Sequence, residues 1–226
     1  MAKCSRVLWR CILVATLTVA ASGLENPALE GSQETSTLSK LTYTKTLKGS
    51  VPEYICISVN ASGAGTYEGR KLDEPPNPLP IQLSPAVVAR LFALTQDLGY
   101  FRGNDLESHK KVANMGQKVF TYQQGNEISR AEFNYTLNRQ AQELSELFEK
   151  IASVEQHLTT LEFSMKYDPL GLPAELRQIQ IDLANGALAD PQLLVPSLEK
   201  ISRNSRYMHL AQSRAQDILQ RIQANN

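Results

Sequence analysis

The fold of this chain is decided by residues 138–165, NRQAQELSELFEKIASVEQHLTTLEFSM. Apolar residues recur there at steps of three and four, which keeps one stripe on a single helical face for about three heptads. The stripe consists of Leu144, Leu147, Ile151, Val154, Leu158, Leu161 and Met165. We therefore predict one long amphipathic helix over residues 138–166, which joins short strands before it to shorter helices after it.

Strands and turns are predicted before this helix, because apolar and polar residues alternate between clusters of glycine, serine and asparagine. The predicted strands cover residues 41–47, 52–59, 64–69, 117–123 and 128–136. A helix with Ser84 as its N-cap and Pro85 in its first turn separates the third strand from the fourth, and Gly99 ends it. Residues 73–80 hold four prolines, so we expect them to run extended and unpaired over the surface. Residues 40–137 thus form an α+β sheet domain.

Three shorter helices are predicted after the long one. Two prolines and a glycine in residues 167–173 break the long helix, and Gly186 ends the next segment. Asp190 is expected to cap the following helix, which Pro191 starts. None of these helices is long enough to be stable alone, so residues 167–226 should fold back on the long helix. The predicted fold class is α+β: an antiparallel sheet of about five strands with a packed helix, then a long helix and an antiparallel helical extension.

The N-terminus has the pattern of a secretory signal peptide. A basic segment ends at Arg10, an apolar run follows from Cys11 to Ala21, and small residues precede Glu25. We predict a signal peptide over residues 1–23 and a flexible linker, rich in Gly, Ser, Thr and Glu, over residues 24–39. The uncharged run is shorter than the roughly 20 residues that a membrane helix needs. We therefore expect export without stable membrane insertion after cleavage, with an uncleaved anchor as the alternative.

Composition narrows the classes of function. The chain has 42% hydrophobic and 20% charged residues, as folded proteins do. Loss of Lys3, Arg6 and Arg10 with the signal peptide lowers the 23 basic residues to 20, against 23 acidic ones. This mildly acidic balance argues against nucleic acid as a partner. Cys56 is then the one cysteine left, so no internal disulfide is possible; a small buried residue is the simpler interpretation and a reactive thiol the alternative.

Familiar catalytic signatures are absent from the sequence: it has no G-x-S-x-G, no H-E-x-x-H, no P-loop and no G-x-G-x-x-G. His157 and His209 are interpreted as boundary positions of helices, and no two histidines have the spacing of metal ligands on one helical face. We predict neither catalytic residues nor a metal or cofactor. The tyrosines at 43, 54, 67, 122 and 135 fall on predicted strands and suit either core packing or an aromatic platform.

The irregular stretch over residues 100–116 is the predicted binding surface, because long loops in compact domains are often functional. Its candidate binding residues are Asp105, Glu107, His109, Lys110 and Lys111. Two carboxylates and an imidazole could also approach a metal, although a solvated charged loop explains the same residues more simply. Asn60 and Asn134 begin N-glycosylation patterns, the second at a strand end where access is restricted.

Several short patterns give the chain a family resemblance. They are Pro52-Glu-Tyr-Ile55, Leu83-Ser-Pro85, Arg90-Leu-Phe92, Val112-Ala-Asn-Met-Gly116 and Asn134-Tyr-Thr136. In this order, over about residues 40–222, the sequence resembles uncharacterised exported bacterial proteins of acidobacterial type. The resemblance implies a location in the bacterial envelope and carries no active-site residues.

These features together predict an exported, non-catalytic interaction protein, periplasmic or secreted, whose partner is another protein. Two alternatives stay open. One is an inhibitor of a secreted or periplasmic hydrolase that presents residues 100–116 to its target, and the other is a hydrolase with a dispersed acid/base or metal site.

Overall fold

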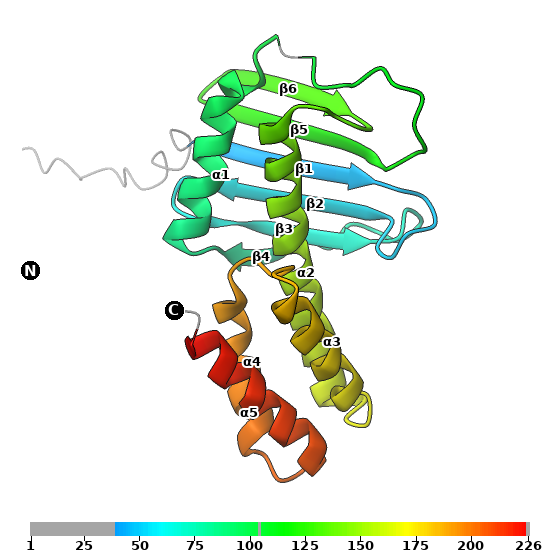
Figure 1. Cartoon of the computed structure of the whole chain (residues 1–226), viewed down its shortest axis with the longest axis vertical. Coiled ribbons are helices and arrows are strands. Elements are labelled where there is room, and N and C mark those ends of the chain that lie inside the picture. Colours follow the sequence, from blue (N-terminus) through cyan, green and yellow to red (C-terminus); the bar gives the residue numbers. More distant parts are fainter. Residues whose placement is uncertain (1–38, 104, 225–226) are drawn as a thin grey trace, which may run out of the picture. The chain divides into compact units, whose positions relative to one another are not determined.

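The computed structural model describes residues 39–103 and 105–224, which belong to one compact unit, Glu34–Asn226. The predicted signal peptide and nearly all of the predicted linker lie outside the described residues. Within them the chain forms an antiparallel sheet and five α-helices, which confirms the α+β prediction (Figure 1). The predicted long helix and the helices after it are also present.

The sheet has six strands in the order β4-β3-β2-β1-β5-β6, and all neighbours are antiparallel. The strands are β1 (Lys40–Thr46), β2 (Tyr54–Asn60), β3 (Ala64–Arg70), β4 (Leu79–Gln82), β5 (Gln117–Gln124) and β6 (Glu127–Phe133). Central strand β1 pairs Tyr43 with Ile57 on one side and with Phe120 on the other. All three side chains point to the same buried face, as the alternating pattern requires.

Strand β4 corrects the prediction for residues 73–80. Leu79 and Pro80 pair with Tyr67 and Thr66 of β3, so the end of the proline-rich segment joins the sheet. Proline is tolerated because β4 is an edge strand, which has only one neighbour to satisfy. At four residues the strand is too short to show a clear alternating pattern in the sequence.

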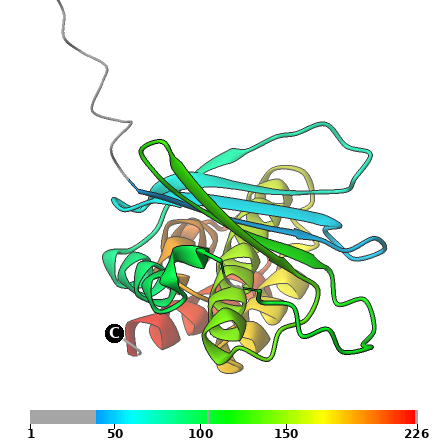
Figure 2. The same cartoon turned by 90° about the horizontal axis from the view of Figure 1, so that it is seen from above.

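Two helices, α1 (Pro85–Asp97) and α2 (Arg139–Tyr167), cross one face of the sheet, and no described helix covers the opposite face (Figure 2). Helix α1 begins at its predicted N-cap, Ser84, and α2 begins after Asn138, the first residue of the predicted long helix. The side chain of Ser84 accepts a hydrogen bond from the backbone N–H of Val87, and that of Asn138 from Ala141. The predicted stripe of α2 is buried at Leu144, Ile151, Val154 and Leu161 and half-buried at its other three positions.

The C-terminal helices pack on the second half of α2 and on one another. They are α3 (Leu172–Ala184), α4 (Val195–Arg203), which follows the 3₁₀ turn η3 (Pro191–Leu194), and α5 (His209–Ala224). We call α3 to α5 the helical extension. Aliphatic residues fill the space between these helices, with Leu176, Leu198 and Ile218 fully buried.

Asp190 does not cap a helix as predicted. Its backbone is left-handed, with φ at 61°, and its side chain makes no capping hydrogen bond. Instead, Asp190 Oδ2 accepts a hydrogen bond of 2.6 Å from the backbone N–H of Ser84. This contact ties the start of η3 to the start of α1, and no local sequence pattern reports a partner so distant along the chain.

Candidate functional site

The predicted binding loop is anchored to the sheet rather than free. Glu107 Oε2 accepts a 2.6 Å hydrogen bond from the backbone N–H of Asn134, and the Ser108 N–H donates to Tyr135 O at 2.8 Å. The Asn134 side chain accepts from Met115 N and donates to Ala113 O, so its amide is engaged within the loop. Hydrogen bonding from Asn134 lowers the pKa of Glu107.

The other four predicted binding residues do not converge on one point. His109 Nε2 lies 2.6 Å from Asp105 Oδ2, and both side chains are exposed. This hydrogen bond raises the pKa of His109 and lowers that of Asp105. Lys110 and Lys111 are exposed, and neither ammonium group pairs with a described carboxylate. The structure therefore gives Glu107 an anchoring position and places the other residues on a solvated loop surface.

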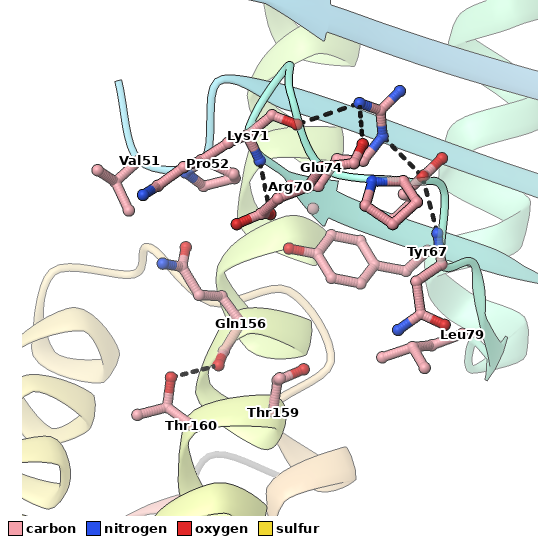
Figure 3. A pocket seen from close by; sticks show the side chains of 14 residues that line it. Val51, Pro52, Tyr67, Arg70, Lys71, Glu74, Leu79, Gln156, Thr159 and Thr160 are labelled. Carbon is pink, nitrogen blue, oxygen red and sulfur yellow. Dashed lines mark hydrogen bonds and ion pairs between the residues drawn. The ribbon is translucent and has the colours of Figure 1, made fainter. Parts of the chain in front are cut away.

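A groove that the sequence did not reveal lies between α2 and two loops of the sheet (Figure 3). Three adjoining hollows, of about 350, 170 and 630 Å³, share Val51 as a lining residue. We call them together the Val51 groove. The β1–β2 loop and the β3–β4 loop form one wall, and the side of α2 that carries Ser153, Gln156 and Thr160 forms the other. Val51 itself is 82% exposed.

Hydrogen bonds fix the conformation of the two loops. The Glu53 carboxylate accepts from Gly49 N at 2.8 Å and from Leu72 N at 3.1 Å, which ties the β1–β2 loop to the β3–β4 loop. These bonds, the one from Gly49 first, lower the pKa of Glu53. Ser50 Oγ donates within its own loop, at 2.7 Å to Leu47 O. The wall of the groove is therefore preorganised.

Arg70 orders the β3–β4 loop from the end of its strand. Its guanidinium donates to Glu68 Oε1 at 2.9 Å and to three backbone carbonyls of the loop, those of Lys71, Leu72 and Glu74. The same group lies 4.6 Å from the centre of the Tyr54 ring. Most of its donors are thus used inside the protein.

Tyr67 supplies the floor of the groove. Its ring is buried, and its hydroxyl end points toward the space between Pro52 and Gln156 (Figure 3). No described residue makes a hydrogen bond with this hydroxyl, and burial raises the pKa of Tyr67 to about 12, so it stays protonated. Gly69 is required beside it, because a Cβ atom there would collide with the Tyr67 hydroxyl. The hydroxyl is an uncommitted donor and acceptor.

The part of α2 that lines the hollow of about 350 Å³ carries neutral polar side chains, and Glu149 and Ala152 line the groove further toward the N-terminus of the helix. Thr159 and Thr160 donate to the helical carbonyls of Glu155 and Gln156, each at 2.9 Å, and keep lone pairs free to accept. The Gln156 amide makes no hydrogen bond with a described residue. In the hollow of about 350 Å³ the charges balance, since Arg70 and Lys71 stand with Glu68 and Glu74, and over all three hollows four basic side chains face five acidic ones. The site therefore suits an uncharged polar ligand with apolar parts.

Acid/base or nucleophilic chemistry finds little support in this groove. Its described lining contains neither histidine nor cysteine. The carboxylates of Glu53 and Glu68 accept hydrogen bonds from backbone or guanidinium donors, and that of Glu149 accepts from Lys45 Nζ at 2.9 Å. These contacts occupy the three carboxylates as hydrogen-bond acceptors. The groove therefore offers a ligand the hydrogen-bonding groups of Tyr67 and Gln156 and the apolar surface of Val51, and these suit binding rather than catalysis.

His157 differs most from its prediction. It is not a boundary position but a buried residue, with Nδ1 2.6 Å from Glu175 Oε1 and Nε2 2.9 Å from Asp182 Oδ2. The sequence did contain a signal: Glu175 and Asp182 are seven residues apart and so share one face of their helix. Because His157 lies among the apolar residues of the packing face of α2, it could have been predicted to contact Glu175 and Asp182 on the next helix.

The structure also shows the positions of the candidate tyrosines and of Cys56. Tyr43, Tyr67 and Tyr122 are buried, as the core interpretation predicts. Cys56 is half-buried, and burial raises the pKa of its thiol, which disfavours the reactive thiolate. In residues 39–103 and 105–224, no group of three or more His, Cys, Asp or Glu is arranged to hold a metal ion. None of the helices in those ranges has both the length and the hydropathy of a membrane span.

The comparison with known proteins assigns no family. No protein-family model matches the chain, and no curated protein matches its sequence. The resemblance to exported proteins of acidobacterial type therefore stays a prediction.

Proposed function

We propose that this chain is an exported, non-catalytic binding protein that takes an extended, uncharged polypeptide segment of a partner into the Val51 groove. The observation that carries the proposal is the meeting of three hollows at one exposed aliphatic residue held in ordered loops. An exposed valine costs free energy in water, and a preordered wall reduces the entropy lost on binding.

The chemistry of the groove favours a polypeptide. Unused groups of Tyr67 and Gln156 can pair with main-chain N–H and C=O groups of an extended segment. Val51, Leu79 and the flanking prolines offer aliphatic surface to apolar side chains. Since basic and acidic side chains are nearly balanced along the groove, a charged segment would lose hydration with little net attraction to the protein.

The dimensions of the groove agree with such a ligand. Its helical wall runs from Glu149 to Thr160, which is roughly 16 Å at 1.5 Å per residue. An extended segment of about five residues spans that length. Beyond Thr160 the same side of α2 carries Phe163 and Tyr167, an exposed aromatic pair with ring centres 5.2 Å apart. A longer partner would find further apolar surface there.

The binding test begins with selection of a random-peptide phage library on the chain without residues 1–23. Dissociation constants of the enriched peptides are then measured by fluorescence anisotropy. We expect Val51→Asp to weaken binding at least tenfold and Tyr67→Phe, which removes one hydroxyl, about three- to tenfold. Ile128→Asp on β6 is the matched control, since Ile128 is also exposed but lines none of the three hollows. Equal losses in the Val51 and Ile128 variants, or no enrichment, would refute the groove.

Export is tested separately. Residues 1–39 are fused to an alkaline phosphatase that is active only outside the reducing cytoplasm. We expect activity and a mass that shows loss of the first 21 or 23 residues. A fusion without residues 11–21 is the control. Equal activity from both fusions would contradict the signal-peptide assignment.

A second candidate function, inhibition of a secreted hydrolase, is supported by the anchoring of residues 105–116. The loop is held by hydrogen bonds from Asn134 N–H to the Glu107 carboxylate and from Met115 N–H to the Asn134 side chain, while Lys110, Lys111 and the Met115 side chain stay exposed. A preordered exposed loop is the form that binds a partner at low entropic cost. Dose-dependent loss of peptidase activity on a fluorogenic casein substrate, abolished by Lys110→Glu/Lys111→Glu, is expected if the loop acts this way. Inhibition that the double variant retains would exclude it.

A further inference from the structure

Two buried titratable residues lie two positions apart on α2, where the helical extension packs against it. The exposed fraction is 7% for His157 and 8% for Glu155. Their contacts face different neighbours: His157 meets α3, whereas Glu155 lies near Tyr67 of β3 and Asp190 at the start of η3. Gln156 of the Val51 groove stands between them in the sequence.

His157 fastens α3 to α2 through both ring nitrogens. Nδ1 contacts Glu175 at 2.6 Å and Nε2 contacts Asp182 at 2.9 Å. An imidazole donates from both nitrogens only when it carries the extra proton. The other oxygen of Asp182 accepts from the neutral amide of Gln178 at 3.0 Å. Loss of the proton would remove one donor and leave two carboxylates beside an uncharged ring.

Glu155 lies in the opposite electrostatic situation. Its carboxyl group accepts no hydrogen bond from the residues that the structure describes. The groups around it are acidic or neutral: Asp190, Glu162 and the Tyr67 hydroxyl. Asp190 stays engaged with the backbone N–H of Ser84 at 2.6 Å. A negative charge on Glu155 would therefore be buried without a partner and repelled by Asp190.

We propose that His157 and Glu155 together make the docking of the helical extension depend on pH, so that α3 and η3 are held more firmly at pH 5.5 than at pH 8. Raising the pH takes the proton from the ring that joins α2 to α3. It also places a charge on Glu155 beside Asp190. The two residues have opposite charge types and yet act in the same direction. This inference goes beyond the proposed binding function and does not depend on it.

The direction follows from both titrations. Burial alone would lower the pKa of His157, but Glu175 and Asp182 outweigh it and raise the pKa above 6.5. Its contribution to stability is complete below 6.5 and is lost as the pH rises through the folded-state pKa. Burial, with Asp190 and Glu162, raises the pKa of Glu155 from 4.5 to about 7. Its folded state therefore loses stability between those two values, and 5.5 to 8 spans much of the change.

The test measures hydrogen-exchange protection factors of α3 in the full chain at pH 5.5 and pH 8.0, because protection factors remove the intrinsic pH dependence of exchange. We expect the α3 amides to be at least tenfold better protected at pH 5.5. Glu155→Gln keeps the shape and removes the titration, so it should raise protection at pH 8.0 and shrink the ratio severalfold. Glu146→Gln, exposed on the same helix, is the control and should behave like the unaltered chain.

His157→Gln separates the two halves of the proposal. We expect it to lower α3 protection at pH 5.5 while the amides of β1 and β5 keep theirs. Equal α3 protection at both pH values in the unaltered chain would overturn the proposal. An unchanged ratio in Glu155→Gln would remove the carboxyl group from it, and unchanged protection in His157→Gln would remove the imidazole.

Discussion

The two halves of α2 are buried in cores of different composition. Up to Ala152 the helix packs on the sheet, in a cluster that holds the aromatic rings of Tyr43, Phe120 and Phe148. We call this cluster the sheet core. From Val154 onward it packs in the cluster that we call the helical core, where every fully buried member is Ala, Val, Leu or Ile. One continuous helix thus belongs to two hydrophobic cores.

The difference shows what holds each half in place. In the sheet core, large rings stack on one another, with Tyr43 and Phe148 4.9 Å apart at an angle of 8°. Tyr43 and Phe120 lie opposite each other on the neighbouring strands β1 and β5, so the pairing of the strands fixes the positions of these two rings. The helical core contains no paired strands, and aliphatic side chains alone allow the helices to pack in several orientations. Directional polar contacts, those of His157 and Asp190, supply the orientation there.

The largest expected effect comes from the sheet core. Phe148→Ala removes a fully buried ring that contacts two other aromatic rings, and we expect it to lower the free energy of unfolding by about 3–5 kcal/mol. Urea denaturation followed by circular dichroism measures the loss. If the two cores unfold as one unit, both should lose hydrogen-exchange protection together. A loss below about 1 kcal/mol would show that the Phe148 ring contributes little to the stability of the sheet core.

A smaller and more local effect is expected in the helical core. Leu198→Ala opens space in a fully buried position of α4, at a cost of about 2–4 kcal/mol. Because the sheet core is separately packed, we expect faster exchange of α3 to α5 while β1 and β5 keep most of their protection. Equal losses in all these elements would show that the two cores are one cooperative unit.

Asp190→Asn tests the contact between the halves. Asparagine tolerates the left-handed backbone but gives up the charge on the acceptor for Ser84 N–H, so we expect a loss of about 1–2 kcal/mol at pH 5.5. At pH 8 the loss should be smaller, because the variant also removes the charge that repels Glu155. Urea unfolding at both pH values gives the comparison. A loss that is larger at pH 8 would speak against that repulsion.

The smallest effect is expected on the surface of the extension. Arg203 and Glu199 form an exposed pair at 3.4 Å, one helical turn apart on α4. Arg203→Ala should change the free energy of unfolding by less than about 0.5 kcal/mol. A change above 1 kcal/mol in the same urea experiment would mean that the extension depends on surface charge as well as on its buried contacts.

Local patterns predicted the elements of this fold well. The stripe from Leu144 to Met165 predicted α2, and Ser84 was recognised as an N-cap because capping involves a residue three positions away. Five strands followed from alternation. Strand β4 was missed because four residues with a proline give no period, and pairing with β3 decides its structure.

The groove and the polar contacts of α2 could not be predicted in the same way. Val51, Tyr67 and Gln156 meet only after two loops and a helix have been placed, so no spacing in the sequence connects them. Asp190 has a helix-capping pattern, yet its hydrogen bond goes to Ser84 across the fold. The loop over residues 100–116 was correctly recognised as irregular, but its anchoring through Glu107 depends on a strand end that lies later in the chain.

The edges of the sheet have a consequence for self-association. On one side the outermost strand contains Pro80, which has no N–H to offer to an added strand. On the other side β6 displays Arg130 and Glu132, which form an exposed ion pair. Two sheets that met edge to edge would have to bury this pair or accept a gap in the ladder. Growth of the sheet into fibrils is therefore disfavoured at both edges.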